Sequence, residues 1–198
     1  MENFFRPNLL ASPNIPKPLH GVNPRTICGS YWWDNRRQEA YAKHDYRCFA
    51  CGIPKAQADY HQWLEAHEDF EIDWSTGRVE LREIVALCHS CHNFIHNGRL
   101  WAIYKDGQID RNKVVNIIES GFGICKRNNV QPYFGAYLTK YLLHGQTEEV
   151  AIENAKKKGW YPTVEAPWEH WHLVIEGIKY YSPFKSLNEW KEHWKNNT

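Results

Sequence analysis

The sequence is organised around residues 47–96, where three short motifs follow one another. They read RCFACG at Arg47–Gly52, WLEAHED at Trp63–Asp69 and ALCHSCHNFIH at Ala86–His96. Two Cys-x-x-Cys pairs therefore stand on either side of a His-Glu dipeptide, and the second pair leads directly into two histidines. This order predicts two neighbouring metal centres with different roles.

The four paired cysteines predict a structural zinc site. A Cys-x-x-Cys turn directs two thiolates to one point, and two such turns complete the four soft ligands that structural zinc prefers. The predicted ligands are Cys48, Cys51, Cys88 and Cys91. The alternative is two disulfides or four unrelated core cysteines, but nothing else in the sequence indicates an oxidising compartment. The two remaining cysteines, Cys28 and Cys125, are free thiols or a disulfide pair.

Three histidines predict a second metal site. His92 and His96 are four residues apart, so on a helix they share one face and can bind one divalent ion. His67 lies in the alternating run Trp63–His67, which favours a strand, and a strand packed on that helix would add a third ligand. Three protein ligands leave positions for water or a phosphate oxygen, as a catalytic metal needs. Alternatively, these histidines are ordinary polar residues near the zinc site, or one of them replaces a cysteine as its ligand.

The motifs C-x-x-C-G, L-E-x-H-E and L-C-x-x-C-H-x-x-x-H together resemble the HNH endonucleases whose ββα-metal motif is held by a four-cysteine zinc site. The resemblance covers about residues 31–98, including the helix that leads into the motif. In that family the first strand carries a metal ligand followed by a general base, and the helix supplies the other ligands. The resemblance implies His67, His92 and His96 as ligands and Glu68 as the base. A second alignment makes His67 the base and leaves Ala66, which cannot bind metal, at the ligand position.

The resemblance implies metal-dependent hydrolysis of phosphodiester bonds in DNA, with structural Zn²⁺ and catalytic Mg²⁺ or Mn²⁺. Glu68 or a metal-bound water would act as base, and the other reading of Glu68 is a solvent-facing residue or a group that orients His67. The chain departs from the family in its carboxylate base and its missing central Asn, near whose place stand Arg82 and Glu83. The same pattern therefore also fits an inactive zinc module of this fold. Such a module would bind nucleic acid or inhibit a protein partner, as a phage or mobile-element counter-defence protein does.

The composition limits how the chain can bind DNA. A net charge of +1 means that a nucleic-acid surface must be a local patch. The basic residues closest to the first cysteine pair are candidate phosphate contacts, or else a solvated helix face: Arg36, Arg37, Lys43 and Arg47. No run is apolar enough for a signal peptide or a membrane span, so together with the paired cysteines the sequence predicts a cytoplasmic protein.

We divide the 198 residues into a Pro-rich N-terminal arm (1–29), an HNH-like zinc domain (30–107) and a C-terminal region of unknown role (108–198). The prolines of the arm are expected to exclude helix from residues 1–26. Helices are expected at 30–43, 90–104, 110–125, 132–144, 147–158 and 186–194, and strands at 59–73, 80–87, 170–175 and 178–181. The predicted class is α+β, in which an HNH-like zinc-stapled core precedes a mainly helical region that ends in a β-hairpin and a short helix. The C-terminal region is a candidate protein-binding surface, and cutting both DNA strands would favour a homodimer.

Overall fold

The structure is a computed structural model that describes residues 5–159 and 166–195. Within these ranges the fold contains seven α-helices and a four-stranded mixed sheet, which confirms that it is α+β. The chain forms two compact units. Of the described residues, unit 1 contains 5–14, 39–67 and 85–159, and unit 2 contains 15–38, 68–84 and 166–195. The predicted arm and C-terminal region also include residues 1–4, 160–165 and 196–198, which lie outside the described residues.

The Pro-rich N-terminal segment contains helical turns that the sequence analysis excluded. Two 3-10 helices, η1 (Pro7–Ala11) and η2 (Lys17–Leu19), each have a proline in their first two positions. Helix α1 (Pro24–Lys43) also begins at a proline. The prediction that residues 1–26 exclude helix is therefore wrong, because the fixed φ of proline suits the first turn of a helix even though it disrupts the interior. Gly29 interrupts α1 with a φ of 84°, and the part of the helix after it matches the expected one.

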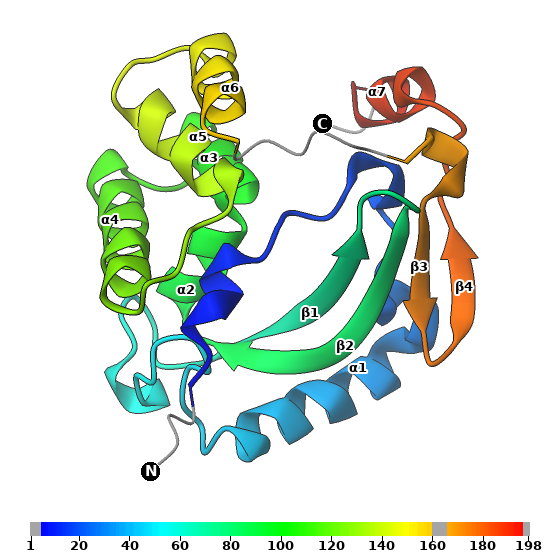
Figure 1. The fold of residues 1–198 in the computed structure, drawn as a ribbon. Helices are drawn as coiled ribbons and strands as arrows, with labels where there is room; N and C mark the ends of the chain where they lie inside the picture. Colours follow the sequence, from blue (N-terminus) through cyan, green and yellow to red (C-terminus); the bar gives the residue numbers. More distant parts are fainter. Residues whose placement is uncertain (1–4, 160–165, 196–198) are drawn as a thin grey trace. The chain divides into compact units, whose positions relative to one another are not determined.

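Strands β1 (Glu65–Asp73) and β2 (Arg78–Leu87) form a long hairpin around the turn at 74–77 (Figure 1). The backbone N–H of Gly77 donates to the carbonyl of Asp73 at 2.9 Å, which closes the turn. The Asp73 carboxylate accepts hydrogen bonds from Ser75 and Thr76, and these bonds lower its pKa to about 2. β1 begins later than the sequence suggested, because the segment before it bends at Tyr60, which has a φ of 74°.

The C-terminal hairpin completes the sheet. Strand β3 (His172–Ile175) pairs in parallel with β2, with Arg78 opposite His172, and β4 (Ile178–Tyr181) pairs antiparallel with β3. Both residues of the turn between them have positive φ, as a two-residue hairpin turn requires. The hairpin was predicted, but its parallel pairing with β2 was not. The core of unit 2 gathers under it: Leu19, Val22, Val79, Ala166, Trp171, Leu173 and Ile175.

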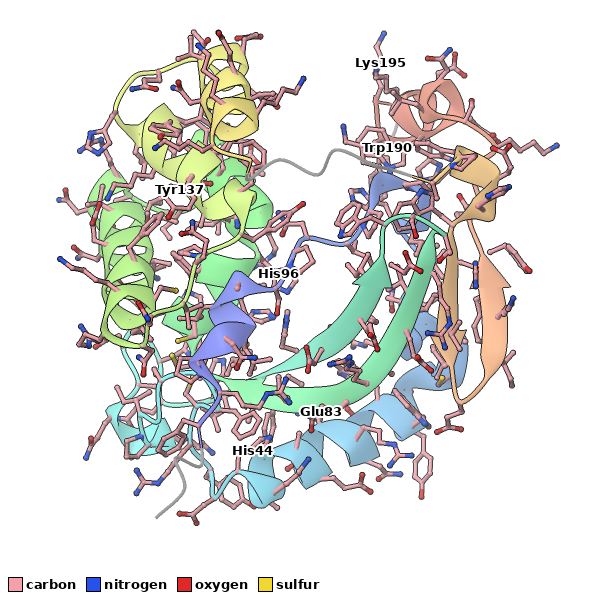
Figure 2. All side chains as sticks on the ribbon, in the orientation of Figure 1. His44, Glu83, His96, Tyr137, Trp190 and Lys195 are labelled. Carbon is pink, nitrogen blue, oxygen red and sulfur yellow. The ribbon has the colours of Figure 1, made fainter. Side chains whose placement is uncertain are left out.

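The helix expected at 90–104 is two helices, α2 (His89–Ile95) and α3 (Asn97–Lys105). The chain turns at His96, which has φ −83° and ψ 45°, and not at Gly98, which lies inside α3. The buried amide of Asn97 donates to two carbonyls at the end of α2 at 3.2 and 3.0 Å, so it holds this junction. His96 therefore stands at the corner between the two helices, where Figure 2 labels it.

The remaining helices agree with the predicted ones within a few residues. They are α4 (Arg111–Arg127), α5 (Phe134–Leu143), α6 (Glu148–Lys157) and α7 (Leu187–Lys195). Two short 3-10 turns, η3 (Lys55–Gln57) and η4 (Trp168–His170), precede β1 and β3. Side chains of Asp110 and Thr147 cap α4 and α6 by accepting a backbone N–H three residues on. In the described part of the chain, none of the helices is both long and apolar enough to cross a membrane.

Candidate metal centres

The four paired cysteines come together in unit 1. Their sulfur atoms all lie within 4.8 Å of one another, and the sulfurs of Cys51 and Cys88 are 3.9 Å apart. A tetrahedral zinc ion with bonds of about 2.3 Å holds its sulfur ligands about 3.8 Å apart. Cys48, Cys88 and Cys91 are buried in the core of the unit. The four thiols therefore fit a metal ion such as zinc.

Local backbone hydrogen bonds aim the two pairs at each other. In the first pair, Gly52 has a φ of 80° and donates its N–H to the carbonyl of Cys48 at 2.8 Å, which makes the tight turn. In the second pair, Cys88 stands at the N-cap of α2, and its carbonyl accepts the N–H of His92 at 3.0 Å. Phe49 donates its N–H to the carbonyl of Ala86 at 2.8 Å, and this bond joins the first turn to the end of β2.

The thiols also influence one another's ionisation. Hydrogen bonds from Cys51, Cys88 and Cys91 lower the pKa of Cys48, whereas contacts with Cys48 and Cys51 raise the pKa values of Cys88 and Cys91. The physical cause is that a thiolate at Cys48 places a negative charge beside Cys88 and Cys91. A bound dication offsets this charge, since it holds all four as thiolates.

The three predicted histidine ligands also converge. His67 of β1 and His92 and His96 of α2 and its C-cap place ligand atoms within 4.8 Å of one another. The Nδ1 of His67 lies 3.1 Å from the Nε2 of His96. His67 is 4% exposed, and the other two are partly buried. The structure thus brings together the His67, His92 and His96 set that the spacing predicted.

Burial keeps His67 and His96 in the form that binds metal. Burial, followed by the nearby His96 and His92, lowers the pKa of His67. Burial also lowers the pKa of His96 to about 3, with smaller effects from His92 and Arg99. Neutral imidazole is the form that ligates metals, so the site favours ligation over protonation.

A second cluster was missed by the sequence analysis. It consists of His61, Glu65 and His89, whose ligand atoms also lie within 4.8 Å of one another. Glu65 precedes His67 by two residues in β1, so the two share a face of the strand, and this signal was available in the sequence. His89 precedes His92 by three residues on α2, which also places the two on neighbouring parts of one face. His61 carries no such signal, because it lies in the bent segment before β1.

Glu65 contacts both histidine clusters. Its Oε1 is 2.7 Å from His89 Nδ1 and 3.2 Å from His61 Nε2, and its Oε2 is 2.5 Å from His92 Nδ1. Burial alone would raise the pKa of Glu65, but hydrogen bonds from His89 and His92 outweigh it and lower the pKa well below its ordinary range. Glu65 is therefore an ionised carboxylate between two groups of imidazoles.

Two side chains support α2 from outside the clusters. Asn93 is fully buried, and its amide donates to the carbonyl of His89 at 2.9 Å. Its amide oxygen accepts from Arg99 at 3.3 Å, and the charge of Arg99 in turn acts on His96. These contacts position α2 and were not predicted from the sequence.

Glu68, the predicted base, stands apart from these groups. It follows His67 in β1, and successive side chains of a strand point to opposite faces. Within residues 5–159 and 166–195, Glu68 belongs to none of the groups that could hold a metal ion. Its role as a base stays a prediction. Arg82 and Glu83, near the place of the family's Asn, lie in β2.

The predicted phosphate contacts are distributed over both units and several have protein partners. Arg36 pairs with Glu176 at 3.4 Å, and Arg37 pairs with Asp34 at 2.8 Å. Arg47 lies 3.5 Å from the Asp45 carboxylate, and Lys43 is the last residue of α1. Of these, 36 and 37 are in unit 2, whereas 43 and 47 are in unit 1.

Comparison of the chain with protein-family models, with curated proteins and with solved structures returns no match.

Proposed function

We propose that this chain is a metal-dependent endonuclease of the HNH type that hydrolyses phosphodiester bonds in DNA. The observation that carries the proposal is the convergence of His67, His92 and His96 on one point, with His92 directly after a cysteine of the zinc-type cluster. The order of elements, a hairpin of β1 and β2 followed by α2, supports the same conclusion, since the ββα-metal motif has this order.

The three imidazoles would hold a divalent ion and leave positions for a phosphate oxygen. When bound, such an ion supplies Lewis-acid stabilisation of the phosphate and of the leaving oxygen. Imidazole nitrogens suit transition-metal ions better than Mg²⁺, so of the two predicted ions we propose Mn²⁺. For the four cysteines we propose Zn²⁺ with a structural role.

The reaction also needs a base within hydrogen-bond reach of the attacking water. Glu68 is the base that the sequence predicts. Glu65 is a second carboxylate, and it contacts the imidazoles directly. We assign to Glu65 the orientation of the histidine ligands, in the way that carboxylates commonly hold metal-binding histidines.

The test is cleavage of supercoiled plasmid by the purified protein with Mn²⁺, Mg²⁺, Zn²⁺ or a chelator. We expect metal-dependent nicking that is lost in His67→Ala and in His96→Ala. The matched control is His144→Ala, which removes an exposed histidine of unit 1 that belongs to neither cluster. Zinc content should stay unchanged in all three variants. Cleavage that persists in both cluster variants would contradict the proposal.

A second candidate function is a catalytically inactive module that binds a protein partner. The observation that favours it is the pairing of Arg36 and Arg37 with carboxylates, which reduces the charge they can offer to phosphates. Salt dependence separates the two functions. Binding through phosphate contacts weakens steeply and linearly with the logarithm of the salt concentration, whereas a protein interface responds weakly.

A further inference from the structure

We infer that His61, Glu65 and His89 form a second divalent-metal site, and that Glu65 joins it to the site of His67, His92 and His96 in a two-metal centre. The HNH resemblance implies one catalytic ion, so this goes beyond it. Its role in cleavage rests on the proposed function, but the binding of two ions does not.

The first argument is the distance between the three ligand atoms. Glu65 Oε1 lies 2.7 Å from His89 Nδ1 and 3.2 Å from His61 Nε2, and the two nitrogens are 2.8 Å apart. An octahedral ion with bonds of about 2.0–2.1 Å holds adjacent ligand atoms about 2.9 Å apart. The three atoms therefore have the spacing of one face of such an octahedron.

The second argument is the number of protons available. The His61 nitrogen and the His89 nitrogen can each carry at most one proton, and the ionised carboxylate of Glu65 carries none. At most two of the three short contacts can therefore be hydrogen bonds, and the third brings together two atoms with no proton between them. A single cation at the centre satisfies all three contacts at once, because each atom then directs a lone pair toward it.

The third argument is that the cluster is held in place. The ring of His61 stacks on that of Trp63 with centroids 3.5 Å apart and planes 5° from parallel. The buried amide of Asn93 donates to the carbonyl of His89. The cluster thus has the fixed geometry of a built site.

The carboxylate of Glu65 connects the two sites. One of its oxygens belongs to the second cluster, and the other lies 2.5 Å from His92 Nδ1 of the first. A carboxylate shared in this way is suited to a pair of ions. In phosphodiester hydrolysis, two-metal sites stabilise the attacking and the leaving oxygen together. The two clusters and Glu65 supply such a centre with five imidazoles and one carboxylate.

The test is the number of ions that the purified full chain binds. Protein that retains its cysteine-bound zinc is dialysed against excess Mn²⁺, desalted, and analysed for both metals by atomic emission. We expect about two manganese ions per chain in the wild type, since a two-metal centre binds a pair. We expect about one in His61→Ala and in His89→Asn, and no change in His144→Ala. Electron paramagnetic resonance should show a coupled manganese pair in the wild type that is lost in both cluster variants.

The use of two variants guards against a failure of one to fold, and circular dichroism identifies such a failure. If the manganese count is the same in wild type, His61→Ala and His89→Asn, the second site does not exist. A single manganese ion in the wild type would overturn the inference equally. These outcomes are separable from the proposed function. Two bound ions with no cleavage of any nucleic acid would contradict the nuclease and leave the two-metal centre standing, whereas metal-dependent cleavage by wild-type protein that binds a single manganese ion would do the reverse.

Discussion

The four-cysteine cluster and the histidine clusters share α2 but differ in chemistry and exposure. Cys48 and Cys91 are at most 1% exposed and belong to the core of unit 1, so their metal would replace part of that core. His89 and His92 have side chains that are 17% and 16% exposed. A closed set of soft thiolates stabilises a fold, and an open set of imidazoles with one carboxylate can exchange water or substrate. The difference teaches that one short helix can supply a closed thiol cluster and an open imidazole cluster through adjacent residues, Cys91 and His92.

The largest expected effect on stability and zinc binding comes from the removal of one of the four thiolates. Cys48→Ala should abolish zinc binding and unfold unit 1, because structural zinc contributes about 10 kcal/mol or more of folding free energy. Zinc content and circular dichroism measure the effect. The matched control is Cys125→Ala, a buried cysteine outside the cluster. If Cys48→Ala melts near the wild-type temperature, the cluster is not a structural zinc site.

Metal removal should separate the two kinds of site. Brief treatment with a chelator should remove ions from the histidine clusters and abolish cleavage by at least about 100-fold, because three neutral ligands with open positions hold a divalent ion less tightly than four thiolates. The melting temperature should stay near its starting value until the zinc itself is extracted. If the chelator removes zinc and unfolds the protein before it removes manganese, the histidine clusters hold their metal more tightly than the cysteine cluster, which contradicts the expected order.

Acid should destabilise the metal-free protein through the histidine clusters. Burial lowers the pKa of His96 from 6.5 to about 3, so between these values the unfolded chain binds a proton that the folded chain does not. The free energy of unfolding should therefore fall as the pH drops through this window, by a few kcal/mol. Urea titrations of chelator-treated protein at several pH values measure the slope. His96→Gln should flatten it, and an unchanged slope would argue against the burial of a neutral imidazole there.

A pair of matched substitutions on β1 distinguishes the two glutamates. Glu65→Gln should reduce cleavage about 10- to 100-fold and weaken manganese binding, because Glu65 contacts imidazoles of both proposed metal sites. Glu68→Gln should leave manganese binding unchanged, and it should reduce the rate only if Glu68 is the base. Manganese titrations and cleavage rates together decide the roles. Weaker manganese binding in Glu68→Gln alone would contradict the assignment to Glu65.

The smallest expected effect is on the packing that supports α2. A Cβ on Gly121 of α4 would overlap the ring of Phe94 of α2. Gly121→Ala should therefore cost about 1–3 kcal/mol of stability and shift α2, which carries ligands of both kinds of site. Thermal melting and manganese affinity measure the two consequences. Gly123→Ala is the control, since a Cβ there meets only the tip of a flexible arginine.

Local spacing predicted most of the candidate site, because its signals are short. The Cys-x-x-Cys turns and the His-x-x-x-His spacing depend on a few neighbouring residues, so the sequence alone indicates the four paired cysteines and the set of His67, His92 and His96. His61 was missed because it has no periodic relation to its partners. Glu65 and His89 were missed although strand and helix periodicity place them beside His67 and His92.

The fold was predicted element by element but not in its long-range pairing. Each hairpin and most helices follow from periodicity and turn residues. The parallel pairing of β2 with β3 brings together Arg78 and His172 and depends on packing between distant segments. The break at His96 also escaped prediction, because it depends on the side chain of Asn97, which donates to a carbonyl at the end of α2.

The alternation of the two units along the chain limits how the protein can be divided. Each described unit is assembled from three separate stretches, and both β1 and β2 pass from one unit into the other. No single cut can release either unit as a continuous polypeptide, and deletion of unit 2 would sever the chain between Glu65 and the α2 ligands. Truncation, domain transplantation or recombination at any one point should therefore yield incomplete units, so that the candidate metal sites and the sheet should be lost together.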